Sequence, residues 1–433
     1  MWARVCLLFA LTCTLSAQTL ARPGLAGSGL DKNPWWQRAI FYQVDSPAES
    51  TDFKAIAARL DALRALGVDA LLLPAPALPT NGGALPPSID DLDTLLRQSS
   101  AHSIRVLLTL PPSSSAADLS GVARFWLSRG VAGLHIATPP GTSPEAAQAM
   151  VEAVRKLAAG TVGQRIILSD VDLALPGANQ APSHRPAARA AARTSGAQLQ
   201  IDSRLNSLPT IDAATLRGFL VQTLAQPNLL LDVRPPNSAA SLAHVVATVA
   251  LLTLPSSVIN SDAHLTIEPA PDLPPVAEET EPAAKPTPPP QPPPGTYLPY
   301  VPYIPPSRPK PKAAPKPVPP DPLTVWYQQL MALHHDNAVV RNGAKTFLDF
   351  DAQNALVWVD RPATSSPQTP PVVVICNLSA SPTQLSLTSA MDHLNLHGWF
   401  LRPLLRSYEA MGAQPLDSIS VPPFGVYIGE LRR

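Results

Sequence analysis

Charged residues and cysteines are scarce in this chain of 433 residues. Charged side chains make up 15% of it, and 32 basic residues balance 32 acidic ones, so the formal net charge is zero. A balanced chain has no global electrostatic attraction to nucleic acid or to an anionic membrane. The sequence also contains no Cys-x-x-Cys pair, no phosphate-binding glycine loop and no Ser-His-Asp signature. We therefore expect no nucleic-acid partner, no cofactor and no metal site.

Residues 1–21 have the pattern of a secretory signal peptide. Arg4 supplies the positive charge, and the apolar stretch 5–16 is too short to span a bilayer. Residues 19–21, Thr-Leu-Ala, form a small-residue cleavage site, so the mature chain is expected to begin near Arg22. This pattern predicts a secreted or periplasmic protein.

The three cysteines fit that interpretation. Cys6 and Cys13 leave with the signal peptide, which excludes an intramolecular disulfide in the mature chain. Cys376 lies in the apolar run VVVICNL, which predicts a buried thiol. No later apolar segment is long enough to cross a membrane, so we expect no transmembrane span in the mature chain.

Strand patterns and helix patterns alternate between residues 34 and 267. Near-continuous apolar runs are typical of buried parallel strands; they cover residues 40–44, 68–76, 104–112, 133–140, 164–172, 198–205, 227–233 and 254–265. Stretches with apolar residues three and four apart are typical of amphipathic helices; they cover residues 52–66, 89–100, 119–129, 145–158, 212–224 and 238–253. This order predicts an α/β protein with a (β/α)8 TIM barrel.

The segment from 346 to 433 has a different pattern. Short stretches of alternating apolar and polar residues, such as ALVWVDR and TQLSLTS, are typical of antiparallel strands. They predict a C-terminal β-sandwich domain.

Three segments of the chain resemble motifs of the α-amylase family, glycoside hydrolase family 13. GVAGLHIATPP, residues 130–140, resembles the fourth-strand motif, and LPSSVINSDAHL, residues 254–265, resembles the eighth strand and its turn. PLTVWYQQL, at the start of residues 322–345, resembles the last barrel helix. The resemblance covers nearly all of the mature chain outside one proline-rich segment. It implies a (β/α)8 barrel, a C-terminal β-sandwich, and retaining glycoside cleavage by two carboxylates.

That proline-rich segment covers residues 268–321 and holds many of the 53 prolines. Runs such as KPTPPPQPPP favour polyproline II. By the resemblance, the segment is an insertion in the loop after the eighth strand. Tyr297, Tyr300 and Tyr303 recur every three residues, so their rings share one face of such a helix. Two hypotheses stay open: the stripe docks on a protein partner or over the barrel mouth, or the segment is a linker without a partner.

The catalytic positions that the resemblance implies carry unusual residues. The fourth strand holds Ala137 where the family has its nucleophilic Asp, and His135 where it has an Arg. Alanine has no oxygen with which to form a glycosyl-enzyme bond. The fifth strand ends in Asp170 where the family has a Glu as general acid, and Asp170 is shorter by one methylene.

The third and seventh strands also depart from the family pattern. The third offers Thr109, Ser113 and Ser114 where the family has an Asp-x-x-x-Asn-His pattern. The seventh gives VRP, residues 233–235, without a gap, whereas a small gap lets Asp232 stand in for the third carboxylate. The short loop after the third strand predicts a shallow cleft and no structural calcium.

Two interpretations of the remaining polar residues stay open. Asp170 and Asp232 form a residual active site, or they are polar groups at strand ends that meet water or cap a helix. Asp172 shares a face with Asp170, and together with His135 and Arg234 it is a candidate substrate-binding residue.

These residues support three functional hypotheses. The first is a catalytically degenerate member of the family that binds an α-glucan or oligosaccharide, or serves as an interaction scaffold. The second is a weakly active glycoside hydrolase acting on α-glucosides through relocated carboxylates. The third is a structural envelope protein that uses the proline-rich arm.

Overall fold

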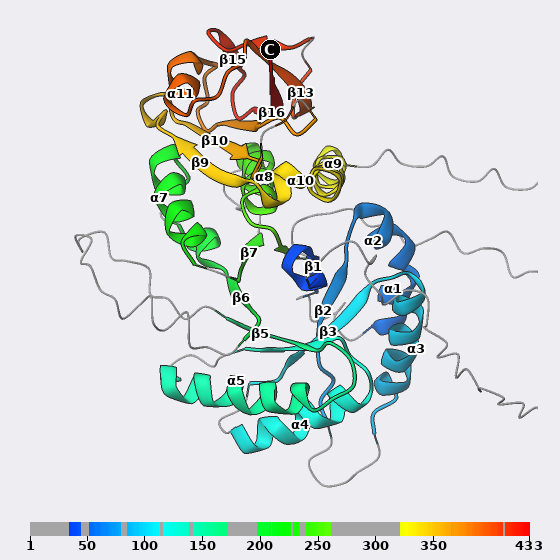
Figure 1. The fold of residues 1–433 in the computed structure, drawn as a ribbon. Helices are drawn as coiled ribbons and strands as arrows, with labels where there is room; N and C mark the ends of the chain where they lie inside the picture. The colour runs from blue at the N-terminus through cyan, green and yellow to red at the C-terminus, as the bar shows by residue number, and fades with distance from the viewer. Residues whose placement is uncertain are drawn as a thin grey trace, which may run out of the picture.

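A closed barrel of eight parallel strands forms the larger part of the fold (Figure 1). The computed structural model describes residues 34–44, 52–78, 85–112, 116–137, 142–170, 197–208, 210–226, 228–233, 240–260, 321–364, 366, 368–409 and 412–433. The barrel strands are β1 (Ile40–Gln43), β2 (Ala70–Pro74), β3 (Arg105–Leu110), β4 (Gly133–Ile136), β5 (Ile166–Asp170), β6 (Leu199–Asp202), β7 (Leu229–Val233) and β8 (Ser257–Asn260). Each pairs with the next in parallel, and β8 closes the ring by pairing with β1.

Helices alternate with these strands and cover the outside of the barrel. They are α1 (Phe53–Ala58), α2 (Leu60–Leu66), α3 (Ser88–Ala101), α4 (Ala116–Ser128), α5 (Pro144–Ala159), α7 (Ala213–Leu224), α8 (Ala243–Leu252) and α9 (Pro322–Asp336). Local sequence fixes where several of them begin. The side chains of Asp52, Ser143, Asp212 and Asp321 accept hydrogen bonds from backbone N–H groups of the first turns of α1, α5, α7 and α9.

The barrel interior is filled by side chains of alternate strand residues. Phe41, Leu72, Leu107, Leu168 and Leu230 belong to this inner cluster, and each is fully buried. The barrel is therefore a packed core rather than a pore.

Gly133, at the start of β4, shows how tightly that wall is built. A Cβ at this position would collide with the backbone oxygen and the side chain of Ile166 on β5. Only glycine lets β4 and β5 pair at this point.

An antiparallel domain follows the barrel. Its six-stranded sheet has the order β14-β13-β16-β11-β10-β9, and β12 and β15 form a second sheet of two strands. The elements of this part of the chain are α10 (Ala338–Asn342), β9 (Ala344–Leu348), β10 (Ala355–Arg361), β11 (Val372–Asn377), β12 (Thr383–Leu385), α11 (Thr388–His393), β13 (Phe400–Arg406), β14 (Gln414–Pro415), β15 (Ile419–Val421) and β16 (Val426–Arg432).

One face of the six-stranded sheet packs on the barrel helices, and the other forms a separate core. Trp358 and Ile428 share the large cluster with Leu251 and Val246 of α8. Val357, Ile375 and Leu401 face the second cluster, together with residues of β12, β15 and α11. Figure 1 shows the sheet standing beside α7, α8 and α9, away from α3, α4 and α5.

The predicted fold class is confirmed. The barrel and the C-terminal antiparallel domain are both present, and Cys376 is buried in β11 as expected. The signal-peptide residues 1–21 and nearly all of the proline-rich segment 268–321, including its three tyrosines, lie outside the described residues. Among the helices that the structure describes, none combines the length and the apolarity that a membrane span needs.

Candidate functional site

The inner wall of the barrel changes from apolar to polar toward the carboxyl ends of its strands. Because side chains alternate along a strand, residues two positions beyond the apolar inner layer face the same interior. On β1, β3, β4, β5, β7 and β8 these residues are Gln43, Thr109, His135, Asp170, Asp232 and Asn260. We call this set the polar layer. The carboxyl end of the strands is the end at which barrels of this kind carry their sites.

His135 links two other members of the polar layer. The residue is 5% exposed, and its Nε2 lies 3.0 Å from Oδ1 of Asp170 while its Nδ1 lies 3.2 Å from Oγ1 of Thr109. An ionised carboxylate only accepts, so Nε2 carries the proton and donates it to Asp170. In the neutral ring Nδ1 then accepts from the hydroxyl of Thr109. The three side chains thus form one hydrogen-bonded chain that joins Thr109, His135 and Asp170.

Asp170 is the exposed end of this chain. Its side chain is 41% exposed, whereas that of His135 is 6% exposed. A buried ring therefore orients a carboxylate that solvent can reach. Such a group can accept hydrogen bonds from a ligand in the barrel mouth.

Asp232 is held differently. It is 3% exposed, and its Oδ2 accepts a hydrogen bond of 3.1 Å from Nδ2 of Asn206. Asn206 lies in the 3-10 turn Arg204–Ser207, which follows β6. The guanidinium of Arg204 fixes that turn by donating two hydrogen bonds, of 2.9 and 2.7 Å, to the fully buried Asp202. Asp232 is thus a buried carboxylate that is hydrogen-bonded to the turn after β6.

Ala137 directly follows β4 and is partly buried. The position that the resemblance gives to the nucleophile is therefore present in the fold and carries only a methyl group. Asp172, Arg234, Ser113 and Ser114 lie outside the described residues, so their roles stay predictions.

The structure brings together residues that the sequence left separate. Thr109 and His135 are register partners across β3 and β4, and His135 reaches Asp170 on β5. Gln43, Asn260 and Asn206 were missed altogether. The alternation of side chains along a strand could have predicted Gln43 and Asn260, because they lie two residues after the inward-facing Phe41 and Val258.

The described residues offer no constellation for a metal. No group of three or more His, Cys, Asp or Glu side chains among them is placed to hold an ion. His393 ends α11 and His397 lies in the loop after it, so their four-residue spacing is not that of one continuous helix.

No protein-family model matches the sequence, and no curated protein does. Solved structures share its fold. An isomaltulose synthase, PalI from Klebsiella sp. LX3, aligns with a TM-score of 0.59 at 11% sequence identity, over 93% of this chain and 100% of that chain. A trehalulose synthase, MutB from Pseudomonas mesoacidophila MX-45, aligns with a TM-score of 0.60 at 14% identity, again over 93% and 100%.

An inactive double mutant of MutB, solved in complex with isomaltulose, aligns with a TM-score of 0.59 at 14% identity, over 93% of this chain and 100% of that chain. These neighbours are members of the α-amylase family, so the resemblance is confirmed at the level of the fold. At such low identity the likeness concerns the fold alone.

Proposed function

We propose that this chain is an α-amylase-family protein that binds an α-glucoside sugar at the barrel mouth without hydrolysing it. The proposal includes a secreted or periplasmic location, on the strength of residues 1–21. The single observation that supports this proposal most strongly is Ala137. Its methyl side chain provides no oxygen at the end of β4, where the family has its nucleophile. A retaining glycosidase needs a carboxylate nucleophile as well as a general acid.

The polar layer supports sugar binding. It places carboxylate, imidazole, hydroxyl and amide groups at the carboxyl ends of the barrel strands, and Asp170 is both hydrogen-bonded to His135 and accessible to solvent. Sugar hydroxyls donate and accept hydrogen bonds, so a few convergent polar groups of this kind suit them.

The solved neighbours support the combination of binding with inactivity. One MutB structure holds the substrate sucrose, and the inactive double mutant, in which one Asp is replaced by Ala and another by Asn, still holds isomaltulose. That protein therefore still binds a disaccharide after two of its carboxylates have been removed. We extend the same combination to this chain.

A second candidate function is weak hydrolysis by Asp170 and Asp232. Both carboxylates belong to the inner face of the barrel, which favours it. The burial of Asp232 and its bond to Asn206 weigh against it, because a nucleophile must reach the sugar.

Proton NMR separates these functions. The full chain would be mixed with sucrose, isomaltulose and maltohexaose, and anomeric signals and saturation transfer would be followed together. We expect saturation transfer without new anomeric signals, and weaker transfer in an Asp170→Asn variant. The matched control is Glu152→Gln, which changes a surface carboxylate of α5. New anomeric signals that disappear in Asp170→Asn would establish hydrolysis, and no transfer from any of the three sugars would refute the binding proposal.

The proline-rich segment adds a separate hypothesis. It connects β8, whose last residue Asn260 belongs to the polar layer, to α9. Our hypothesis is that its tyrosine stripe docks on a partner protein or on the barrel itself. Replacing Tyr297, Tyr300 and Tyr303 together by Ser should raise protease sensitivity of the segment or weaken sugar binding. If neither changes, the segment is a linker.

A further inference from the structure

A polar pocket lies on the outside of the barrel, between α3 and the residues that follow α4. We propose that it binds the phosphate group of a small phosphate ester. Two of its lining residues, Gly130 and Arg165, precede β4 and β5, so they lie at the amino ends of the strands, opposite the polar layer. The pocket shares no residue with that layer, and it therefore stands or falls independently of the function proposed above.

The pocket exists because α3 and α4 are not packed on each other. α3 packs on α1, and α4 packs on α5, whereas α3 and α4 make few contacts. The space has a volume of about 890 Å³, which is within the usual range of small-molecule sites. We call it the α3 pocket.

One face of α3 forms a wall of the α3 pocket. Asp90, Asp93, Thr94, Arg97 and Ser100 line it, and they are spaced three and four residues apart, so they lie on the same side of the helix. The buried residues of α3 belong to other positions of the helix. The wall is therefore polar, with carboxylate, hydroxyl and guanidinium groups side by side.

Arg165 indicates most clearly that the α3 pocket takes an anion. Its Nη1 donates a hydrogen bond of 3.1 Å to the carbonyl of Gly130, and its Nε is buried without a hydrogen-bond partner among the described residues. Burial lowers the pKa of this guanidinium, and no carboxylate in the described part of the chain offsets that effect. A guanidinium has five N–H donors, and a partly buried charge is stabilised by an opposite charge.

Two more guanidinium groups line the pocket. Arg129 is ion-paired with Asp93 and lies over the ring of Phe125, 4.9 Å from its centroid, so its position is fixed. Arg97 is exposed, and within the described residues its guanidinium bonds only to a hydroxyl of its own helix. Asp93 neutralises Arg129, and Arg97 and Arg165 form no ion pair with any described carboxylate. An anionic ligand would supply the charge that these two groups lack.

Asp90 places a negative charge at the other end of the pocket. It lies in the first turn of α3, seven residues before Arg97, which corresponds to about 10 Å along the helix axis. The α3 pocket is therefore basic at one end and acidic at the other. A ligand that spans it carries an anionic group for the arginines and an ammonium or hydroxyl group for Asp90.

A phosphate monoester matches this pattern better than a carboxylate does. Its terminal oxygens point in different directions, and each planar guanidinium can bind two of them. The two oxygens of a carboxylate lie in one plane and satisfy a single guanidinium. The alcohol part of the ester can extend from Arg97 and Arg165 toward Asp90. Such a phosphate group occurs both in free esters and in lipid headgroups.

The test is isothermal titration calorimetry of the full chain with phosphoethanolamine, inorganic phosphate and succinate. We expect phosphoethanolamine to bind most tightly and succinate most weakly. Arg165→Gln and Arg97→Gln should each weaken the binding of phosphoethanolamine about tenfold or more, because each removes charge-assisted hydrogen bonds. Since Arg97 is exposed, its variant keeps the test valid if Arg165→Gln fails to fold.

Two further variants control for charge and for the orientation of the ligand. Arg155→Gln removes a guanidinium that is paired with Glu152 on α5 and does not line the pocket, so it should leave the affinity unchanged. Asp90→Asn should weaken the binding of phosphoethanolamine but not that of inorganic phosphate, because only the former has an ammonium group.

The outcomes that would overturn the proposal are distinct. Succinate that binds as tightly as phosphoethanolamine would contradict the assignment of a phosphate group. Inorganic phosphate that binds as tightly would contradict the assignment of an ester. An equal loss in Arg155→Gln, or no binding of any of the three compounds, would refute the site. None of these results bears on the barrel mouth.

Cosedimentation with vesicles distinguishes the two sources of the phosphate group. Phosphatidylcholine vesicles would be compared with vesicles that also contain phosphatidic acid, which presents a phosphate monoester at the surface. Sedimentation that requires phosphatidic acid and is lost in Arg97→Gln would identify a lipid headgroup as the ligand. Binding of soluble phosphoethanolamine without such sedimentation would identify a free ester.

Discussion

Two carboxylates of this protein, Asp170 and Asp360, differ in their solvent exposure and in their hydrogen-bond partners. Asp170, at the barrel mouth, has a side chain that is 41% exposed and is hydrogen-bonded to the imidazole of His135. Asp360, on the face of the C-terminal sheet that packs on the barrel, is fully buried and lies 2.7 Å from Nζ of Lys345, which is 4% exposed. A buried charge must be paired, whereas a charge that water reaches needs no partner of its own. The difference teaches that Asp360 is held in a buried ion pair, while Asp170 keeps part of its carboxylate in contact with solvent.

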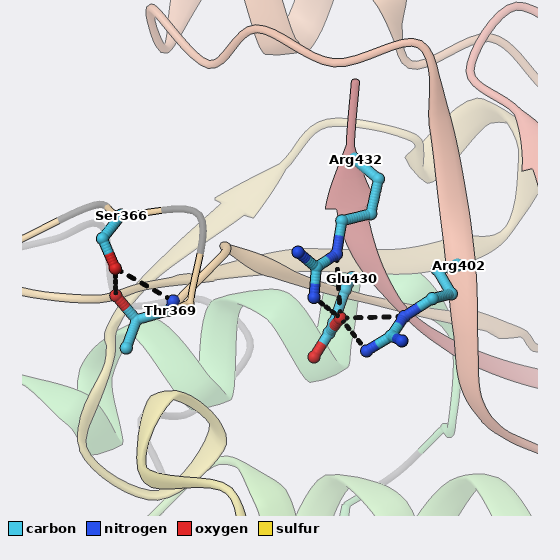
Figure 2. Close-up of polar contacts among 5 residues, drawn as sticks. All are labelled: Ser366, Thr369, Arg402, Glu430 and Arg432. Atoms are coloured by element: carbon cyan, nitrogen blue, oxygen red, sulfur yellow. Dashed lines mark hydrogen bonds and ion pairs between the residues drawn. The ribbon is translucent and has the colours of Figure 1, made fainter.

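The six-stranded sheet also contains an ion pair whose exposure lies between these two cases, that of Arg402 with Glu430 (Figure 2). Lys345, Asp360, Val372, Glu430 and Arg402 are consecutive cross-strand partners on one row from β9 to β13. The pair at one end is buried, whereas Arg402, at the other end, is 55% exposed. Exposure therefore differs along a single row, and the energetic effect of removing a partner should differ with it.

The largest effect is expected from Lys345→Met. It leaves the carboxylate of Asp360 buried without its cation, which costs about 3–5 kcal/mol of unfolding free energy. Thermal and urea unfolding measure this loss. The double variant Lys345→Met with Asp360→Leu should recover most of it, because no buried charge remains. A loss below about 1 kcal/mol in the single variant would show that the pair is not truly desolvated.

The next effect depends on pH and concerns His334, which is 1% exposed in α9 near Arg341 and Lys345. Burial, assisted by the positive charges of His335 and Arg341, lowers the pKa of His334 to about 3 from the ordinary 6.5. The unfolded chain then takes up a proton below pH 6.5 and the folded chain does not. The resulting stability is complete above pH 6.5 and is lost as the pH falls toward 3, by about 1.4 kcal/mol per pH unit.

A His334→Leu variant isolates this contribution. The difference in unfolding free energy between the protein and the variant should change with that slope below pH 6.5 and be constant above pH 7.5. A difference that does not vary with pH would mean that His334 protonates in the folded protein.

A smaller effect is expected from Arg402→Gln. Arg402 shares Glu430 with Arg432, and its own side chain is more than half exposed. Its removal should cost about 1 kcal/mol or less, and the cost should shrink as salt is added. Urea unfolding at two salt concentrations measures it. A cost as large as that of Lys345→Met would remove the distinction between the two ends of the row.

The smallest effect on stability is expected from Asp170→Asn. The amide oxygen can still accept the proton of His135, so the unfolding free energy should change by no more than about 0.5 kcal/mol. The same change should weaken sugar binding, because the carboxylate is lost. A loss of stability above 2 kcal/mol would make Asp170 a structural group, and the contrast with Asp360 would fail.

Most of the barrel could be predicted from the sequence because its strands are buried on both sides. Runs such as Leu71–Leu73 and Leu229–Leu231 leave no other place for so many leucines than the interior of a parallel sheet. The antiparallel domain was harder to predict from the sequence. The six-residue helix α11 begins three residues after β12, so the pattern TQLSLTS predicts a strand where the helix begins. The strand β13 was not predicted, because it contains Pro403 and its register shifts between Pro403 and Leu405.

The candidate site was predictable only in part. Single positions such as Asp170, His135 and Thr109 followed from the resemblance. Their contacts depend on how far each strand is shifted against the next, and on which side chains face inward. The Thr109–His135 pairing joins residues 26 apart in the sequence, and the His135–Asp170 pairing joins residues 35 apart. Composition and periodicity along one strand do not determine such a register.

The two ends of the six-stranded sheet bear on how this protein avoids aggregation. A barrel has no open edge, but a sheet of the order β14-β13-β16-β11-β10-β9 has two, and each could template the addition of a strand from another molecule. At one edge β14 has only two residues, and one of them is Pro415, which has no N–H to offer. At the other, β9 directs the charged Lys345 inward to Asp360, and an inward-pointing charge disfavours the addition of a further strand. The buried pair that stabilises the domain thus also protects its edge against strand-to-strand polymerisation.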